Sequence, residues 1–218
     1  MVQILILAVV AAFLFWRLSI VLGTRSGFEK TADIKVRDIP KKQESIVPSD
    51  QEVDLDEDEI SDYVELSSDP GQALKKIKKN EPNFSISNFV SGAKSAYELI
   101  LMAYEKGDLD TLEMHLEKNV FKDFEAVVTE RADKGYNVEA KFIGLREIRI
   151  KTAFFDEKKN VAEITVFFKC ELTSIVRDKD DNIIEGSPSE IRTHTDLWTF
   201  GRLLGTQDPS WKLIATGD

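Results

Sequence analysis

Two histidines, one cysteine and a polar-aromatic run near the carboxyl end are the groups in this sequence that could carry out chemistry. His194 and Asp196 are two positions apart, and side chains two apart on a β-strand project from the same face. A histidine oriented by a carboxylate can act as a general base, so one alternative is an isomerase or dehydratase. A hydrogen-bonded structural role for Asp196, beside Trp198 and Phe200, is the simpler interpretation.

The remaining reactive residues favour structural roles. A single cysteine excludes an internal disulfide and a cysteine zinc cluster, and two distant histidines give little support to a metal site. Cys170 alternates with Phe168 and Leu172, so we expect a small apolar core residue. His115, among leucines, is predicted to be a packing or helix-surface residue. No catalytic triad order, glycine-rich phosphate loop or acid/base carboxylate pair occurs, so we predict no enzyme, no cofactor and no metal.

The elements that position these residues follow an apolar amino-terminal segment. Residues 2–22 contain only Gln3 and Arg17 as strongly polar residues, and a helix of that span is about 30 Å long, enough to cross a bilayer. The segment is too long and lacks the basic start of a cleaved signal peptide. Lysines and arginines follow the run and none precedes it, which places the carboxyl side in the cytoplasm, or in the matrix of a mitochondrion. We predict a transmembrane helix at residues 1–22, single-pass in a bacterial inner membrane.

Residues 23–69 are predicted to form a disordered acidic linker. Ten acidic residues and no basic one between Asp50 and Asp69 account for the formal net charge of −10. The rest of the chain is close to neutral, so no nucleic-acid-binding face is indicated. A self-repelling extended spacer is favoured. The alternative is a docking tail for a basic partner, with the apolar residues Ile60, Tyr63, Val64 and Leu66.

Residues 70–83 are predicted to form a short basic amphipathic helix that ends before Pro82. Ala73, Leu74 and Ile77 share one helical stripe. Each lysine beside such a stripe adds about 1 kcal/mol of attraction to an anionic lipid surface. The residues predicted to contact anionic headgroups are Lys75, Lys76, Lys78 and Lys79. The alternative is a solvated helix that packs its stripe on the following domain.

Residues 84–218 are predicted to form one folded domain that begins with three helices. The first starts at Ser85 or Ser87 and ends at Gly107, and Asp108 caps the second. The third spans about residues 119–134, before a glycine. Each helix carries a single apolar stripe and needs a sheet to pack against.

Four strands are expected after the helices, at about residues 138–155, 162–172, 190–202 and 211–216. In the first strand, Ile148, Ile150, Thr152 and Phe154 share one face, and a change of phase predicts a bulge near Arg146. Helices followed by long, bent antiparallel strands predict an α+β fold with helices packed on a curved antiparallel sheet. Nuclear-transport-factor-two-like and cystatin-like folds share this cone, which has an apolar mouth.

Residues 84–216 resemble the Tim44-like family. The motifs are Phe89-Val-Ser-Gly-Ala-Lys94, Gly107-Asp108, Phe121-x-x-Phe124, Arg131-x-x-x-Gly135, Asp196-Leu-Trp198-Thr-Phe200-Gly-Arg202 and Asp208-Pro-Ser-Trp211-x-Leu213-x-x-Thr216. The family contains the subunit that tethers the mitochondrial import motor to the inner membrane, and membrane-anchored bacterial relatives. This chain has its own apolar segment and no long amino-terminal docking region, so the bacterial relatives are the closer match.

The resemblance implies a nuclear-transport-factor-two-like cone with a large apolar pocket and a non-catalytic role in recruitment to the inner membrane. It implies structural or pocket-wall roles for Asp196, Trp198, Phe200, Arg202 and Trp211. We therefore expect a membrane-anchored adaptor that holds a partner protein or an apolar ligand near the inner membrane, in protein translocation or membrane-protein assembly. The alternatives are a small-molecule or lipid-acyl binding module and an isomerase or dehydratase.

Overall fold

A computed structural model describes residues 57–217 of the chain. Among these residues, no helix is long and apolar enough to cross a membrane. The transmembrane helix predicted at residues 1–22 and most of the predicted linker lie outside this range. The described part has a helical turn at residues 57–61, then helices α3 (Asp69–Asn80), α4 (Ile86–Lys106), α5 (Leu109–His115) and α6 (Lys118–Asp133).

The boundaries of α4 and α5 confirm the expected capping residues. The Ser85 hydroxyl accepts a hydrogen bond from the Asn88 amide at 3.2 Å, which satisfies a free N–H in the first turn of α4. Gly107 ends the helix with a left-handed φ of 73°. The Asp108 carboxylate then accepts from the Thr111 amide at 3.1 Å and starts α5. These caps fix the turn between α4 and α5.

An antiparallel sheet forms the second layer and confirms the α+β prediction. It contains β1 (Asn137–Asp156), β2 (Val161–Arg177), β3 (Ile183–Gly186), β4 (Arg192–Leu203) and β5 (Lys212–Gly217). The strand order is β1-β2-β4-β5, and β3 pairs with β2 beyond the end of β4. The sequence did not predict β3, because its two isoleucines are adjacent instead of alternating and both are exposed.

Strand β1 bends at several irregularities. Its pairing with β2 shifts between Leu145 and Glu147, which confirms the bulge predicted near Arg146. A further shift between Ile150 and Thr152 was not predicted, and it reverses which side chains face the core. The prediction that Phe154 shares the inner face is therefore wrong, since Phe154 is 58% exposed and Phe155 is buried.

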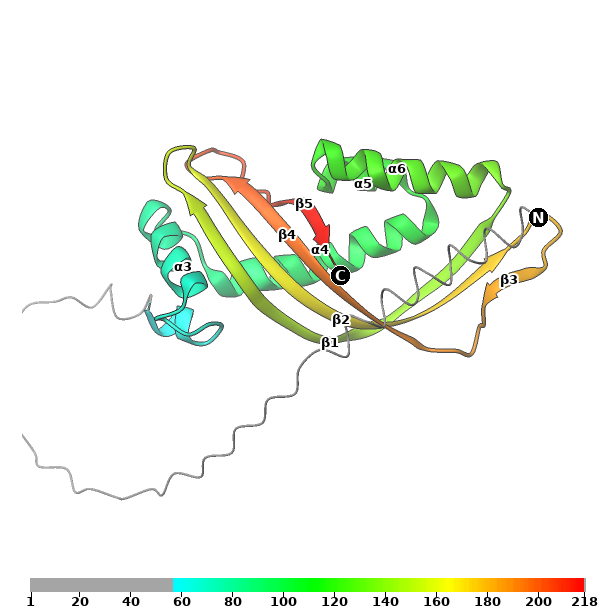
Figure 1. Ribbon diagram of the computed structural model, residues 1–218, viewed down its shortest axis with the longest axis horizontal. Coiled ribbons are helices and arrows are strands. Elements are labelled where there is room, and N and C mark those ends of the chain that lie inside the picture. The colour runs from blue at the N-terminus through cyan, green and yellow to red at the C-terminus, as the bar shows by residue number, and fades with distance from the viewer. Residues whose placement is uncertain (1–56, 218) are drawn as a thin grey trace, which may run out of the picture. The chain divides into compact units, whose positions relative to one another are not determined.

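The curved sheet bends around α4, as Figure 1 shows for the long strands β1 and β2. The inner face of β2 is an alternating row of buried residues, as predicted: Ala162, Ile164, Val166, Phe168, Cys170 and Leu172. One face of α4 packs into this concavity, and its buried residues recur at helical spacing: Ile86, Phe89, Ala93, Tyr97, Ile100 and Ala103. Residues of β4 on the same inner face line the two pockets described below.

Residues 57–69 differ from the predicted disordered linker. Ile60 is 1% exposed and joins the core, and Tyr63, Val64 and Leu66 pack against it. These are the residues of the alternative docking-tail hypothesis, and they dock on this chain's own domain. Their burial, together with ion pairs to α3, favours order over the extended state. The folded unit therefore begins before residue 69.

Candidate functional site

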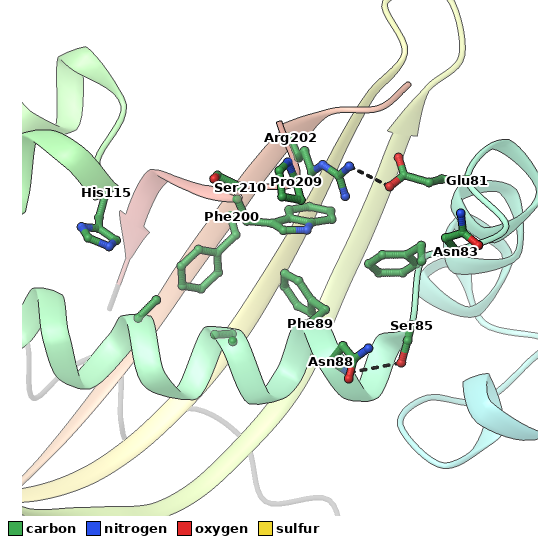
Figure 2. A pocket seen from close by; sticks show the side chains of 15 residues that line it. Glu81, Asn83, Ser85, Asn88, Phe89, His115, Phe200, Arg202, Pro209 and Ser210 are labelled. Atoms are coloured by element: carbon green, nitrogen blue, oxygen red, sulfur yellow. Dashed lines mark hydrogen bonds and ion pairs between the residues drawn. The ribbon is translucent and has the colours of Figure 1, made fainter. Parts of the chain in front are cut away.

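An open pocket lies between the amino-terminal half of α4 and strand β4. Its volume is about 540 Å³. We call it the aromatic pocket after the four rings in its wall: Phe84, Phe89, Phe200 and Trp211. Figure 2 shows Phe89 on α4 facing Phe200 on β4, with His115 at one end and Arg202 at the other.

The four rings form one contacting cluster. The centroid of Phe89 lies 4.8 Å from that of Trp211 and 6.1 Å from that of Phe200, and both pairs meet edge to face. Such offset geometries add to the stabilisation that burial provides. The α4 side of the pocket carries Gly92, Ala93 and Ala96, and a side chain added at Gly92 would meet open space. Small residues on the helix leave the pocket room beside the rings.

The charged groups of the aromatic pocket are already paired. Arg202 contacts the Glu81 carboxylate at 2.7 Å, and the two side chains are 9% and 19% exposed. At the other end, His115 Nδ1 lies 2.9 Å from the Thr111 carbonyl oxygen, which can only accept, so Nδ1 carries a proton. The pocket therefore presents apolar ring surface to a ligand. The charges of Glu81 and Arg202 compensate each other.

A second pocket of about 410 Å³ lies between α4, α6, β4 and β5. We call it the carboxylate pocket because Asp123 and Asp196 line it, together with the rings of Tyr104, Phe124 and Trp198. Thr216 and Gly217 of β5 complete its wall. It shares α4 and β4 with the aromatic pocket and has a different charge.

A buried tyrosine fixes one carboxylate of this pocket. The Tyr97 hydroxyl donates to Asp196 Oδ2 at 2.6 Å and lies 3.1 Å from Cys170 Sγ, so the thiol is the donor in the second contact. Burial, and then the Asp196 carboxylate, raise the pKa of Tyr97 far above its ordinary value. Burial also raises the pKa of Cys170. Both groups stay protonated at neutral pH, and Cys170 is a core residue, as predicted.

His194 and Asp196 share the inner face of β4, as the spacing predicted, but they make separate contacts. His194 pairs with Cys170 in the β2–β4 register and is exposed. Asp196 accepts from Tyr97, and no hydrogen bond joins it to His194 within residues 57–217. The geometry therefore gives no support to the base-and-carboxylate alternative.

The signature residues implied by the family resemblance reach both pockets from one strand. Asp196 and Trp198 line the carboxylate pocket, whereas Phe200 and Arg202 line the aromatic pocket. Alternate residues of a strand face the same side, so steps of two along β4 supply all four. Trp211, just before β5, lines the aromatic pocket. These signature residues thus line two separate pockets, whereas the resemblance implies one large pocket.

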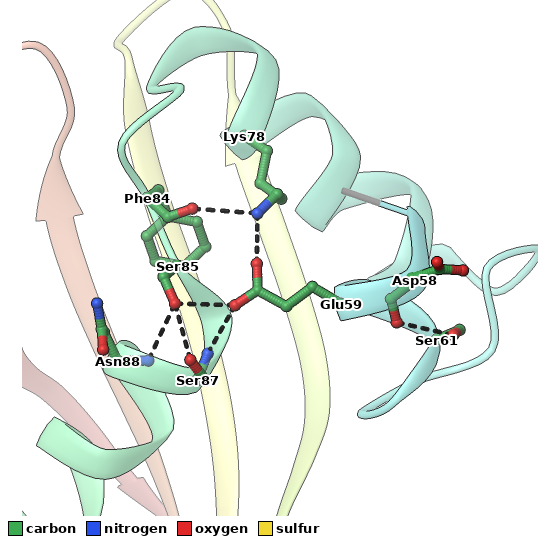
Figure 3. A network of polar contacts seen from close by, with 8 residues as sticks. All are labelled: Asp58, Glu59, Ser61, Lys78, Phe84, Ser85, Ser87 and Asn88. Carbon is green, nitrogen blue, oxygen red and sulfur yellow. Dashed lines mark hydrogen bonds and ion pairs between the residues drawn. The ribbon is translucent and has the colours of Figure 1, made fainter. Parts of the chain in front are cut away.

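The basic helix α3 is bound to the acidic segment before it (Figure 3). Lys78 forms an ion pair with Glu59 and is 6% exposed, which contradicts its predicted contact with lipid headgroups. Lys75 contacts Glu57 at 2.8 Å, and Lys76 contacts Glu157 at 2.9 Å. Of the four lysines, Lys76 and Lys79 are exposed. Lys75, Lys76 and Lys78 thus pair with glutamates of the same domain, whereas the pattern of lysines predicted contact with lipid headgroups.

Glu59 connects three segments. Its carboxylate accepts from the Ser85 hydroxyl at 2.8 Å and from the Ser87 amide at 3.1 Å, at the start of α4. Burial disfavours its ionisation, but hydrogen bonds from Lys78 and from the start of α4 outweigh burial and lower the pKa of Glu59 to about 2. Lys78 also donates to the Phe84 carbonyl at 3.3 Å, so this network holds one wall of the aromatic pocket.

Several of these residues were not assigned to a binding site from the sequence. The aromatic residues Phe84 and Phe89 could have been paired with Trp211 only from the tertiary fold. Glu59 lay in an acidic run that reads as solvated, and the local signal for burial was the nearby apolar residues Ile60, Tyr63, Val64 and Leu66. Glu81 had no local signal, because its partner is more than a hundred residues away.

Residues 71–218 match the family model described as the Tim44-like domain. The chain is 24% identical over 152 residues to the mitochondrial import inner membrane translocase subunit TIM44-1 of Arabidopsis thaliana. This match covers 67% of this chain and 32% of that protein. The chain thus spans about a third of the length of this relative.

Solved structures give weaker likenesses. The intermembrane space region of the chloroplast protein ARC6 aligns with 59% of this chain and 94% of its own, at 12% identity and a TM-score of 0.42. A de novo designed β-sheet protein aligns with 61% of this chain and 88% of its own, at 13% identity and a TM-score of 0.26. Both TM-scores are too low to assign a fold.

Proposed function

Because the chain belongs to the Tim44-like family, we propose that it is a binding module linked to protein translocation at an inner membrane. The named relative is a subunit of a mitochondrial import translocase of the inner membrane. The family model matches residues 71–218, which include the linings of both the aromatic and the carboxylate pockets. Recruitment of a partner is therefore the role that the domain supports best.

The aromatic pocket is the proposed binding site, and its ligand is an apolar segment of a partner protein. The observation that carries this proposal is an open pocket of about 540 Å³ with four contacting rings and an internally paired arginine. Aromatic side chains dominate the binding energy of interfaces when they lie in such pockets. A ligand that carried its own charge would have to compete with the Glu81–Arg202 pair, so an apolar segment fits best.

The proposed role is non-catalytic. A general base must ionise or accept a proton near the working pH. In the interior, Tyr97 and Cys170 have raised pKa values and stay protonated, and Asp196 accepts from Tyr97. These contacts support a structural polar chain over an acid-base pair. An activity that depended on His194 and Asp196 would contradict this part of the proposal.

Site-specific crosslinking in native membranes tests the aromatic pocket. A photoreactive phenylalanine analogue replaces Ser210 at the pocket, and in a control it replaces Ser189 in the exposed loop after β3. We expect a crosslink to a polypeptide from position 210 and none from position 189. The substitution Gly92→Leu, which places a side chain in open space at the pocket wall, should weaken the crosslink. A lipid adduct in place of a polypeptide would instead support the lipid-acyl alternative.

The membrane anchor is a separate part of the proposal. The apolar segment 2–22 and the basic residues after it support a single-pass anchor with the domain on the cytoplasmic or matrix side. The anchor and tether would raise the local concentration of the domain at the membrane without new contacts. The protein should remain in membranes after a carbonate wash, and a carboxyl-terminal reporter should be active only on the cytoplasmic side. Release by carbonate would contradict the anchor.

The exposed lysines of α3 remain the candidates for contact with anionic headgroups. Lys76 and Lys79 are exposed, whereas Lys78 is buried against Glu59. In a chain that lacks residues 1–22, replacing Lys76 and Lys79 with glutamine should weaken binding to vesicles with anionic lipid. Replacing Lys118 and Lys122, two exposed lysines of α6, is the matched control. Equal binding by the two double variants would remove the lipid contact from the proposal.

A further inference from the structure

The carboxylate pocket contains negative charge that the described residues do not neutralise. Asp123 on α6 and Asp196 on β4 line it, and its lining includes no lysine or arginine. Neither carboxylate takes part in an ion pair formed within residues 57–217. Asp196 is half-buried, where water screens a charge less than it does at the surface. The lining of the pocket therefore carries negative charge that a bound cation would neutralise.

The more buried carboxylate is held in one orientation. The Tyr97 hydroxyl donates to Asp196 at 2.6 Å. The tyrosine ring stacks on Phe168 with centroids 4.2 Å apart and an interplanar angle of 9°, and it also contacts Trp198 at 4.7 Å. A carboxylate accepts several hydrogen bonds, and this contact uses one of them. Asp196 is thus fixed before a ligand arrives and keeps acceptor capacity for it.

Aromatic rings complete the surroundings of the two carboxylates. Tyr104, Phe124 and Trp198 line the pocket, and Tyr104 meets Phe124 edge to face with centroids 5.0 Å apart. Ring faces attract ammonium and guanidinium groups and tolerate the apolar stems that carry them. Tyr104 already contacts one guanidinium, that of Arg131, at 4.1 Å from its centroid. The pocket combines the two groups that recognise organic cations, a carboxylate and aromatic faces.

We propose that the carboxylate pocket binds an ammonium or guanidinium group carried on an apolar stem. The charged group would pair with Asp196, with Asp123 beside it, and the stem would lie against Leu101 and Trp198. A free alkylamine and a lysine or arginine side chain of a polypeptide both have this chemistry. The site is separate from the aromatic pocket, so it stands whether or not that pocket binds a partner.

Calorimetry on the full chain in a maltoside detergent tests the charge recognition. The probes are hexylammonium and hexanol, which have the same stem and differ in charge. The protein should bind hexylammonium at least about tenfold more tightly than hexanol, a factor that corresponds to ~1.4 kcal/mol. Asp196→Asn should remove most of this preference, and the asparagine can still accept from Tyr97. Equal affinity of the unaltered protein for the two probes would overturn the proposal.

Two further variants separate binding from folding. Asp123 is exposed, so Asp123→Asn should leave the fold intact and reduce the preference for hexylammonium by a smaller factor than Asp196→Asn. Asp133→Asn removes the same charge from α6 outside the pocket and should leave the preference unchanged. The full preference retained in both Asp196→Asn and Asp123→Asn would overturn the assignment to this pocket.

Competition with peptides identifies the source of the cation. A short peptide of leucine and arginine is compared with the same peptide carrying citrulline, which has the shape of arginine without its charge. Displacement of hexylammonium by the arginine peptide alone assigns a polypeptide side chain, and displacement by neither peptide assigns a free amine. Equal displacement by both peptides would contradict recognition of charge.

Discussion

The aromatic pocket and the carboxylate pocket are lined by the same helix and the same strand, yet their charges are treated in opposite ways. In the aromatic pocket, Arg202 is bound to Glu81 at 2.7 Å. In the carboxylate pocket, Asp123 and Asp196 have no cation in the lining. The charges of the aromatic pocket are thus paired, which suits an apolar ligand. The carboxylates of the other pocket have no cation in the lining, which suits a cationic ligand. The fold separates two kinds of recognition along a single strand.

A short contact joins the end of α5 to β5. Along both segments, it separates the residues that line the aromatic pocket from those that line the carboxylate pocket. Leu116 and Leu213 form an isolated β-bridge, and the Glu117 amide donates to the Leu213 carbonyl at 2.8 Å. His115 and Trp211, on one side of this bridge, line the aromatic pocket, and residues after it line the carboxylate pocket. Both leucines are buried. The bridge therefore lies, along both segments, between the residues that line the two pockets.

The largest effect is expected from truncating the buried side chain of Leu213 at this bridge. Leu213→Ala deletes a fully buried side chain and should lower the free energy of unfolding by about 2–5 kcal/mol. Urea unfolding, followed by the fluorescence of Trp198 and Trp211 in a Trp16→Phe background, measures the change. The variant should also lose the difference in ligand preference between the two pockets.

Leu203→Ala is the matched control, because Leu203 is 50% exposed. It should change the free energy of unfolding by no more than about 0.5 kcal/mol. Equal losses in Leu213→Ala and Leu203→Ala would show that the buried Leu213 side chain contributes no more to stability than an exposed leucine.

The next effect concerns the network behind the aromatic pocket. Glu59→Gln removes the carboxylate that binds Lys78 and the start of α4, and should cost about 2–3 kcal/mol. The pKa of Glu59 is lowered from 4.5 to about 2, so its contribution to stability is complete above pH 4.5 and is lost as the pH falls toward 2. The free energy of unfolding of the unaltered protein should fall as the pH is lowered through this range, and that of Glu59→Gln should not show this fall. The same acid dependence in the variant would assign the loss to other carboxylates.

The fold was largely predictable because its signals are local. Ser85, Gly107 and Asp108 determine helix ends through hydrogen bonds within one turn, and strict alternation determines the buried face of β2. The phase of β1 after residue 150 was not predictable, since the bulge there depends on pairing with a strand that comes later. Phe154 was therefore assigned to the wrong face.

The candidate site was less predictable because its pairs are distant in sequence. Spacing alone placed Asp196 beside His194, whereas its partner is Tyr97 on α4, 99 residues earlier. The lysines of α3 read as a basic surface, because nothing local shows that Glu59 covers Lys78. Periodicity predicts which side of a helix or strand is buried. It does not predict which residue of another element makes contact there.

A smaller difference is expected when one carboxylate is neutralised in each pocket. Glu81→Gln leaves the largely buried Arg202 without its carboxylate and should cost about 1–2 kcal/mol. Asp196→Asn removes a charge that has no paired cation, so it should cost about 1 kcal/mol or less. Parallel urea unfolding of the two variants measures the difference. A larger cost for Asp196→Asn would mean that its pocket already contains a compensating cation.

The smallest effect is a gain in stability at the wall of the aromatic pocket. Gly92 lies within α4 and has open space around the position of a Cβ atom, so Gly92→Ala should add about 0.5–1 kcal/mol. Gly71→Ala is the opposite case, since its Cβ would lie 2.3 Å from the Glu65 carbonyl oxygen, and it should destabilise the protein. A larger side chain in Gly92→Leu should block the aromatic pocket and leave hexylammonium binding in the carboxylate pocket unchanged. Because α4 serves both pockets, loss of both binding activities in a folded Gly92→Leu variant would show that they are coupled and contradict their independence.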